Sequence, residues 1–293
     1  MSQAKGGYYL PEPSHWPIIG SVGLFLTLGG FAMALPSHHD GQMGSLTVMY
    51  VGLAVMVVML FGWFGTVIRE SEGGMYNDQV DMSFRMSMLW FIFSEVMFFA
   101  AFFGALFYAR TLSVPWLGGE GNNLETNKLL WEGFQATWPT NGPGAVGGDF
   151  QTVGAWGIPA WNTLILLTSG LTITWSHWGL KKGNRGQLIL GLFLTVVLGF
   201  IFVGLQAYEY GYAWNDLNLT MGSGIYGSTF YMLTGFHGLH VTIGAIMLLV
   251  ILFRSMKGHF TAKQHFGFEA AAWYWHFVDV VWLGLFIFVY WLA

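Results

Sequence analysis

Seven apolar stretches, each long enough to cross a lipid bilayer as a helix, dominate this 293-residue sequence. The hydrocarbon core of a bilayer is about 30 Å thick, and a helix needs roughly 20 residues to cross it. Because backbone groups in lipid must find partners within the protein, we predict an all-α, polytopic membrane protein. The expected helices lie at residues 16–35, 44–68, 86–109, 154–180, 187–208, 228–253 and 270–292.

The composition agrees with a membrane protein and excludes several kinds of site. Asp, Glu, Lys and Arg make up 9% of the residues, against roughly 25% in soluble proteins, and 54% are hydrophobic. The chain has no cysteine, which excludes disulfides, thiolate zinc sites, iron–sulfur clusters and covalent c-type haem attachment. A net charge of −4, divided between two membrane faces, gives no reason to expect a nucleic-acid partner.

The basic residues predict how the chain is oriented. Cytoplasmic loops of membrane proteins are enriched in Lys and Arg. If the N-terminus is cytoplasmic, only Arg110 and Lys128 of the 11 basic residues fall on the outer side. The remainder fall on the cytoplasmic side: Lys5, Arg69, Arg85, Lys181, Lys182, Arg185, Arg254, Lys257 and Lys263. Seven spans would then place the C-terminus on the outer side.

We expect a single membrane domain over residues 1–293, with two helices in 16–68 and five in 86–292. The one long connection, residues 111–153, is rich in Gly, Pro, Asn and Trp and is predicted on the outer face. Loops of this length are often functional or bind a partner, and an exposed insertion is the alternative.

Five ionisable residues inside the predicted spans define a candidate buried cluster, and Glu269 lies near the start of the last stretch. A charged group at membrane depth is costly, so it usually faces the protein interior and pairs with another polar group. Counted along their helices, Glu95 and Asp279 lie ~14 Å from the inner end and His240 ~20 Å. We therefore predict one cluster joining the third, sixth and seventh spans; simple interhelical hydrogen bonds are the alternative. Its members are Glu95, His237, His240, His276 and Asp279.

Two long segments carry a family resemblance: FYMLTGFHGLHVTIGAI at 230–246 and HFGFEAAAWYWHFVDVVWLGLF at 265–286. Three upstream segments follow the same family in the same order: FIFSEVMFF around Glu95, WGIPAWNTLILLTSGLTITWSHWGL at 156–180, and LQAYEY at 205–210. These segments resemble subunit III of the haem–copper cytochrome c oxidases. The resemblance covers nearly the whole chain from about residue 8.

The resemblance implies a subunit without a redox centre, catalytic residue or metal ligand of its own. Haem and copper are expected in the partner subunits I and II. The resemblance also implies that the first two helices diverge from the other five around a cleft filled with phospholipid. By position we assign lipid headgroups to Trp63, Arg69, Glu70 and Arg254, with His259 as a further candidate. Ordinary snorkelling of these side chains to the membrane surface is the alternative.

The implied function is that of a non-redox subunit of an enzyme, cytochrome c oxidase, in aerobic respiration. Such a subunit stabilises the proton-pumping complex, binds phospholipid and supports proton uptake by subunit I. Cytochrome c would donate electrons to the complex and would not bind mainly to this subunit. A bacterial cytoplasmic membrane is the preferred location, with the C-terminus in the periplasm; a mitochondrial inner membrane is the alternative. Two other functions stay open: subunit III of a quinol oxidase, and a membrane cytochrome with haem between His237 and His276.

Overall fold

The computed structural model describes residues 12–35 and 44–293, and all regular structure in these ranges is helical. Six helices in the described ranges are long and apolar enough to cross a membrane. The predicted all-α membrane fold is confirmed. The chain divides into an N-terminal unit, residues 1–84, and a C-terminal unit, residues 85–293. Lys5, which entered the orientation argument, lies outside the described residues.

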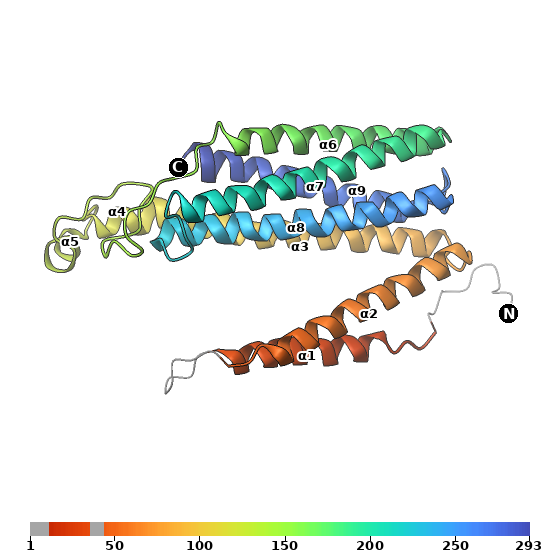
Figure 1. Cartoon of the computed structure of the whole chain (residues 1–293), viewed down its shortest axis with the longest axis horizontal. Helices are drawn as coiled ribbons and strands as arrows, with labels where there is room; N and C mark the ends of the chain where they lie inside the picture. The colour runs from red at the N-terminus through yellow and green to blue at the C-terminus, as the bar shows by residue number, and fades with distance from the viewer. Residues whose placement is uncertain (1–11, 36–43) are drawn as a thin grey trace. The chain divides into compact units, whose positions relative to one another are not determined.

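The N-terminal unit is built around two closely packed helices, α1 (Trp16–Ala34) and α2 (Thr47–Glu72), drawn in red and orange in Figure 1. Glycine allows the close approach: a Cβ atom on Gly30 would lie 2.3 Å from the backbone nitrogen of Met49. Near the other end of the pair, the Trp16 indole donates a hydrogen bond to Thr66 Oγ1 at 3.2 Å. Small residues at such contacts are typical of helices packing in membranes, where lipid supplies no hydrophobic force between helices.

The C-terminal unit contains five long helices that run side by side (Figure 1). Helix α9 contributes most to the core, because Trp275 and Trp282 are almost completely buried among its neighbours. Their indole nitrogens donate hydrogen bonds to Ser169 and Thr163 of α6, both at 2.8 Å. The five helices are α3 (Asp78–Tyr108, from residue 85 on), α6 (Ile158–Lys181), α7 (Arg185–Asn215), α8 (Gly224–Lys257) and α9 (Phe266–Leu285).

Helix α6 corresponds to the span predicted at 154–180, but it is too polar to be counted among the six apolar helices. With 24 residues it has the length to cross a bilayer. Its sequence is rich in Ser, Thr and Trp, and several of these side chains bond to neighbouring helices. Thr172 contacts Thr195 of α7 at 2.8 Å, and Ser176 donates to the Leu188 carbonyl at 2.7 Å. The low hydropathy of α6 therefore reflects polar contacts within the bundle.

Five basic residues at the ends of the long helices of the C-terminal unit gather at one end of the bundle, whereas Arg110 and Lys128 lie in the connection after α3. This is the end at which α6 and α8 finish and α7 begins (Figure 1). Lys181, Lys182, Arg185, Arg254 and Lys257 lie on these helix ends. The segregation agrees with the charge pattern used to predict the orientation, which itself stays a prediction.

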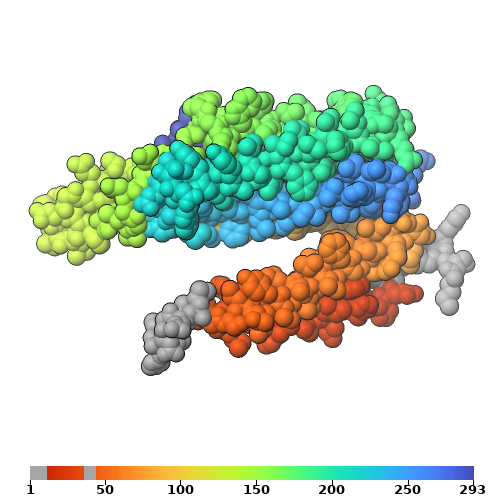
Figure 2. Space-filling model, in the orientation of Figure 1, coloured from red at the N-terminus to blue at the C-terminus, as the bar shows by residue number. Residues whose placement is uncertain are grey.

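The long connection after α3 forms an ordered projection at the opposite end of the bundle, in yellow-green in Figure 2. It contains the π-helical turn η1 (Ala109–Ser113) and two short helices, α4 (Val114–Leu117) and α5 (Leu124–Leu130). Its later part packs on Tyr226 of α8: the Phe150 ring stacks at 5.5 Å, and the Thr140 carbonyl accepts the Tyr226 N–H at 3.2 Å. A second π-helical turn, η2 (Phe286–Trp291), follows α9.

Candidate functional site

Glu95 of α3 and His240 of α8 meet inside the bundle. His240 Nε2 lies 2.9 Å from Glu95 Oε2, and His240 Nδ1 lies 2.6 Å from the Phe236 carbonyl oxygen. A carbonyl only accepts hydrogen bonds, so Nδ1 carries a hydrogen. The hydrogen bond between Nε2 and the carboxyl group then requires a second proton between them. Aromatic rings surround the pair, including that of Phe99 at 5.0 Å from the imidazole.

His237 lies on the same helix as His240 but faces other neighbours. Its Nε2 donates to the Val278 carbonyl of α9 at 3.0 Å. The rings of Phe202 and Trp282 pack around it at 5.7 and 5.2 Å. Its Nδ1 is buried and has no hydrogen-bond partner. His237 thus serves as a buried contact between α8 and α9.

His276 and Asp279 form a third polar group, between α9 and α6. His276 Nδ1 lies 3.8 Å from Asp279 Oδ2, and His276 Nε2 lies 3.3 Å from Thr174 Oγ1. The helices approach closely here, because a Cβ atom on Gly170 would lie 2.6 Å from Asp279 Oδ2. The pair borders a cavity of about 270 Å³ whose remaining walls are Leu167, Gly170, Leu171, Thr174, Val280 and Leu283.

The five residues predicted as one cluster therefore separate into three groups. The expected meeting of Glu95 with His240 is present, but neither His237 nor Asp279 joins it. Counting residues along a helix gives the distance of a residue from the helix end, but it does not give the direction in which the side chain points. Successive helical residues turn by about 100°, so His237 and His240, three apart, point about 60° away from each other. That difference directs His240 toward α3 and His237 toward α9.

Two further buried carboxylates were not in the predicted cluster. Glu209 of α7 is completely buried and accepts hydrogen bonds from Tyr290 at 2.7 Å and Gln206 at 3.1 Å. It was missed because the predicted span ended at residue 208, whereas α7 continues to Asn215. Its place in the segment LQAYEY was the available signal.

Glu269, in the first turn of α9, is the second carboxylate outside the predicted cluster. Arg85 of α3 forms an ion pair with one of its oxygens. His177 and His265 approach the other oxygen at 3.4 and 3.3 Å. Only the pair of His265 with Glu269, four residues apart, could have been read from the sequence, because such residues share a helix face.

The five residues assigned to lipid headgroups lie in both units. In the N-terminal unit, Arg69 donates to Thr66 Oγ1 at 3.2 Å, Glu70 accepts from Tyr76 at 2.7 Å, and Trp63 is 47% exposed. In the C-terminal unit, the Arg254 guanidinium lies 4.6 Å from the centre of the Phe260 ring. The His259 N–H donates to the Arg254 carbonyl at 3.1 Å. The lipid-binding role of these residues stays a prediction.

The described residues do not fit a haem between His237 and His276. Two axial imidazoles must face each other across the iron. His237 is instead enclosed by Phe202 and Trp282 and bonded to the α9 backbone, whereas His276 points toward Thr174 of α6. The alternative of a membrane cytochrome with these ligands is therefore rejected on the packing of the two rings.

Comparison with known proteins identifies the family. The family model for cytochrome c oxidase subunit III matches residues 6–129 and 130–293. The chain is 40% identical over 292 residues to "Cytochrome c oxidase subunit 3" of Gadus morhua and, separately, of Squalus acanthias. The same protein of Neotragus moschatus is also 40% identical, and each alignment covers 99% of both chains. The chain belongs to the cytochrome c oxidase subunit III family, the subunit of an oxidoreductase complex of the respiratory membrane.

Proposed function

We propose that this chain is the non-redox subunit III of a proton-pumping cytochrome c oxidase, which it stabilises and in which it supports proton uptake by subunit I. Its partners are subunits I and II, which hold the haems and coppers, together with membrane phospholipid. The observation that carries the proposal is the family match over nearly the whole chain.

The buried polar groups support a stabilising role. A polar group in the bilayer interior costs free energy unless it is paired. The hydrogen bond between Glu95 and His240 joins α3 to α8. The indole hydrogen bonds of Trp275 and Trp282 join α9 to α6. Side chains that point out from the same helices are largely apolar, such as Trp90 and Val280, which are 67% and 68% exposed. The bundle thereby offers a firm apolar surface to a partner helix or to lipid.

The hydrogen bond between Glu95 and His240 supports the proposed link to proton uptake. Carboxylate and imidazole side chains are the groups that exchange protons in membrane proteins. The pair lies across two helices of one bundle, so its protonation state is coupled to how α3 and α8 pack. A change in that packing is a route by which this subunit would influence a neighbouring proton pathway.

The location and the lipid contacts are part of the same proposal. A bacterial cytoplasmic membrane with a cytoplasmic N-terminus accounts for the distribution of Lys and Arg. Arg69 and Arg254 lie near the carboxyl ends of α2 and α8, and we assign phosphate headgroups to them because guanidinium groups at a membrane surface attract phosphate. The divergence of the two N-terminal helices from the other five, with lipid between them, stays a prediction from the family resemblance.

The test compares the oxidase purified with this subunit and the same oxidase stripped of it. We expect the depleted enzyme to take up protons more slowly and to inactivate after fewer turnovers, with its haem spectrum unchanged. Equal uptake rates and equal lifetimes would contradict the proposal. Assaying reduced cytochrome c and a quinol as alternative donors distinguishes the proposed oxidase from the quinol oxidase alternative.

A further inference from the structure

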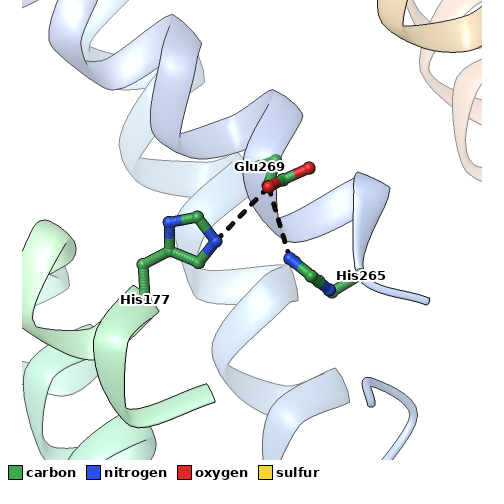
Figure 3. A group of neighbouring side chains, drawn as sticks. All are labelled: His177, His265 and Glu269. Atoms are coloured by element: carbon green, nitrogen blue, oxygen red, sulfur yellow. Dashed lines mark ion pairs between the residues drawn. The ribbon is translucent and has the colours of Figure 1, made fainter. Parts of the chain in front are cut away.

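Three side chains converge between the end of α6 and the start of α9 (Figure 3). His177 comes from the last turns of α6, His265 immediately precedes α9, and Glu269 lies in the first turn of α9. His177 Nε2 and His265 Nε2 lie 3.4 and 3.3 Å from the same oxygen, Glu269 Oε1. One ligand atom from each residue lies within 4.8 Å of the other two.

Neighbouring groups hold these side chains in place. His265 Nδ1 lies 3.0 Å from the Thr261 carbonyl oxygen, and the Phe268 ring packs against His177 at 5.3 Å. Arg85 of α3 pairs with the second oxygen of Glu269, which leaves Oε1 directed at the two imidazoles. The His265 and Glu269 side chains are 7% and 11% exposed, and that of His177 is 19% exposed.

The hydrogen bond to Thr261 determines the chemistry of His265. Because a carbonyl only accepts, Nδ1 carries the hydrogen, which leaves Nε2 as the ring nitrogen that can bind a metal ion. Nε2 faces a carboxylate oxygen, Glu269 Oε1. Both His177 Nε2 and His265 Nε2 are buried and make no hydrogen bond. Buried polar atoms without a partner are unfavourable, and a cation shared by the two ring nitrogens and the carboxylate oxygen gives each of them one.

The spacing fits a particular cation. Zinc binds His nitrogen and carboxylate oxygen at about 2.0–2.1 Å in tetrahedral geometry, which separates neighbouring ligand atoms by about 3.3 Å. The two nitrogen-to-oxygen separations of 3.3 and 3.4 Å match this value. A carbonyl that accepts from the other ring nitrogen, as Thr261 does for His265, is also the usual support for a metal-bound imidazole. Magnesium and calcium prefer sets of oxygen ligands, so two imidazoles disfavour them.

We propose that His177 Nε2, His265 Nε2 and Glu269 Oε1 bind a zinc ion, with a water molecule as the fourth ligand. Such an ion joins the end of α6 to the start of α9. The Arg85 guanidinium, which pairs with the same carboxylate, repels the zinc ion and so lowers the zinc affinity of the site. This site departs from the expectation that the chain has no metal ligands.

The experiment uses the purified full-length chain in detergent, freed of metal and titrated with Co²⁺ and then Zn²⁺. Tetrahedral Co²⁺ absorbs visible light, and the chain has no cysteine to provide competing thiolates. We expect one equivalent of Co²⁺ to bind with a tetrahedral spectrum and one equivalent of Zn²⁺ to displace it. His177→Ala and His265→Ala should each weaken binding roughly tenfold or more. His15→Ala, at an exposed position of the N-terminal unit, is the matched control and should bind as the parent does.

Arg85→Gln separates metal binding from folding, because it should tighten binding while the histidine variants weaken it. Circular dichroism and gel filtration of each variant check that the chain is folded; if His265→Ala is not, His265→Gln takes its place. Absence of saturable Co²⁺ binding would overturn the proposal. Parent-like affinity in both histidine variants, or loss of binding in Arg85→Gln, would overturn it as well.

Discussion

A carboxyl group inside a bilayer needs a hydrogen-bond partner from the protein, and Glu95 finds one in His240. The two residues are 145 positions apart in sequence, and their side chains meet at 2.9 Å. Each is mostly buried, so water supplies little compensation if the partner is removed. The stability of the contact between α3 and α8 should therefore depend on both side chains together.

Replacing Glu95 with Ala should lower the unfolding free energy of the chain by about 1–3 kcal/mol, because His240 loses its partner. A double-mutant cycle with His240→Ala should give a coupling energy of about 0.5–2 kcal/mol. The measurement is reversible unfolding in mixed detergent micelles. Ser94→Ala is the control, since Ser94 bonds only to the Phe91 carbonyl of its own helix. Additive effects of the two substitutions would contradict a direct contact.

The sequence predicts which polar residues are buried better than it predicts which of them contact each other. Helical rise along two spans was enough to bring Glu95 and His240 to similar depths. Whether a side chain faces α3, α6 or α9 depends on the rotation of each helix about its axis, which packing determines. His177 and Glu269 were not paired for the same reason, because they come from different helices, 92 residues apart.

Helices α6 and α7 of the C-terminal unit approach closely at a glycine of α7. A Cβ atom on Gly191 of α7 would lie 2.7 Å from the Ser176 Cβ of α6 and 3.0 Å from the Thr172 carbonyl oxygen. At Gly204 of the same helix, an added Cβ would have no heavy atom within 4 Å. These two glycines therefore have different roles on one helix.

Gly191→Ala should destabilise the chain by about 1–3 kcal/mol, because the added methyl group forces α6 and α7 apart. Gly204→Ala should be neutral or stabilise the chain by up to about 1 kcal/mol, since alanine favours the helix. Thermal unfolding of both variants in the same detergent provides the comparison. Equal stability of the two variants would show that the α6–α7 contact is looser than described.

The length of an apolar stretch predicts that a helix is present, but it does not predict where that helix begins and ends. The span predicted at 228–253 is the 34-residue helix α8, about 51 Å long and longer than the hydrocarbon core. Backbone hydrogen bonding continues past the apolar stretch into the headgroup region, so hydropathy marks the crossing and underestimates the helix. For the same reason the predicted span ended at residue 208 and left out Glu209, although α7 continues to Asn215.

At the scale of the whole chain, the distribution of charge predicts the orientation in the membrane. The parent chain has no cysteine, so single cysteines can be introduced at exposed basic positions without background labelling. Lys182→Cys, just after α6, should react with a membrane-impermeant maleimide only from the cytoplasmic side. Lys128→Cys, in α5, should react only from the opposite side. The reverse pattern in sealed vesicles of known orientation would contradict the predicted topology.

The central claim is that this chain works as part of a haem–copper oxidase, and copurification tests it most directly. The chain, carrying an affinity tag, is expressed in its native membrane and isolated in mild detergent. Subunits I and II should elute with it in equal amounts, with haem absorbance and cytochrome c oxidase activity in the same fraction. A folded chain that elutes without haem, copper or either catalytic subunit would contradict the assignment.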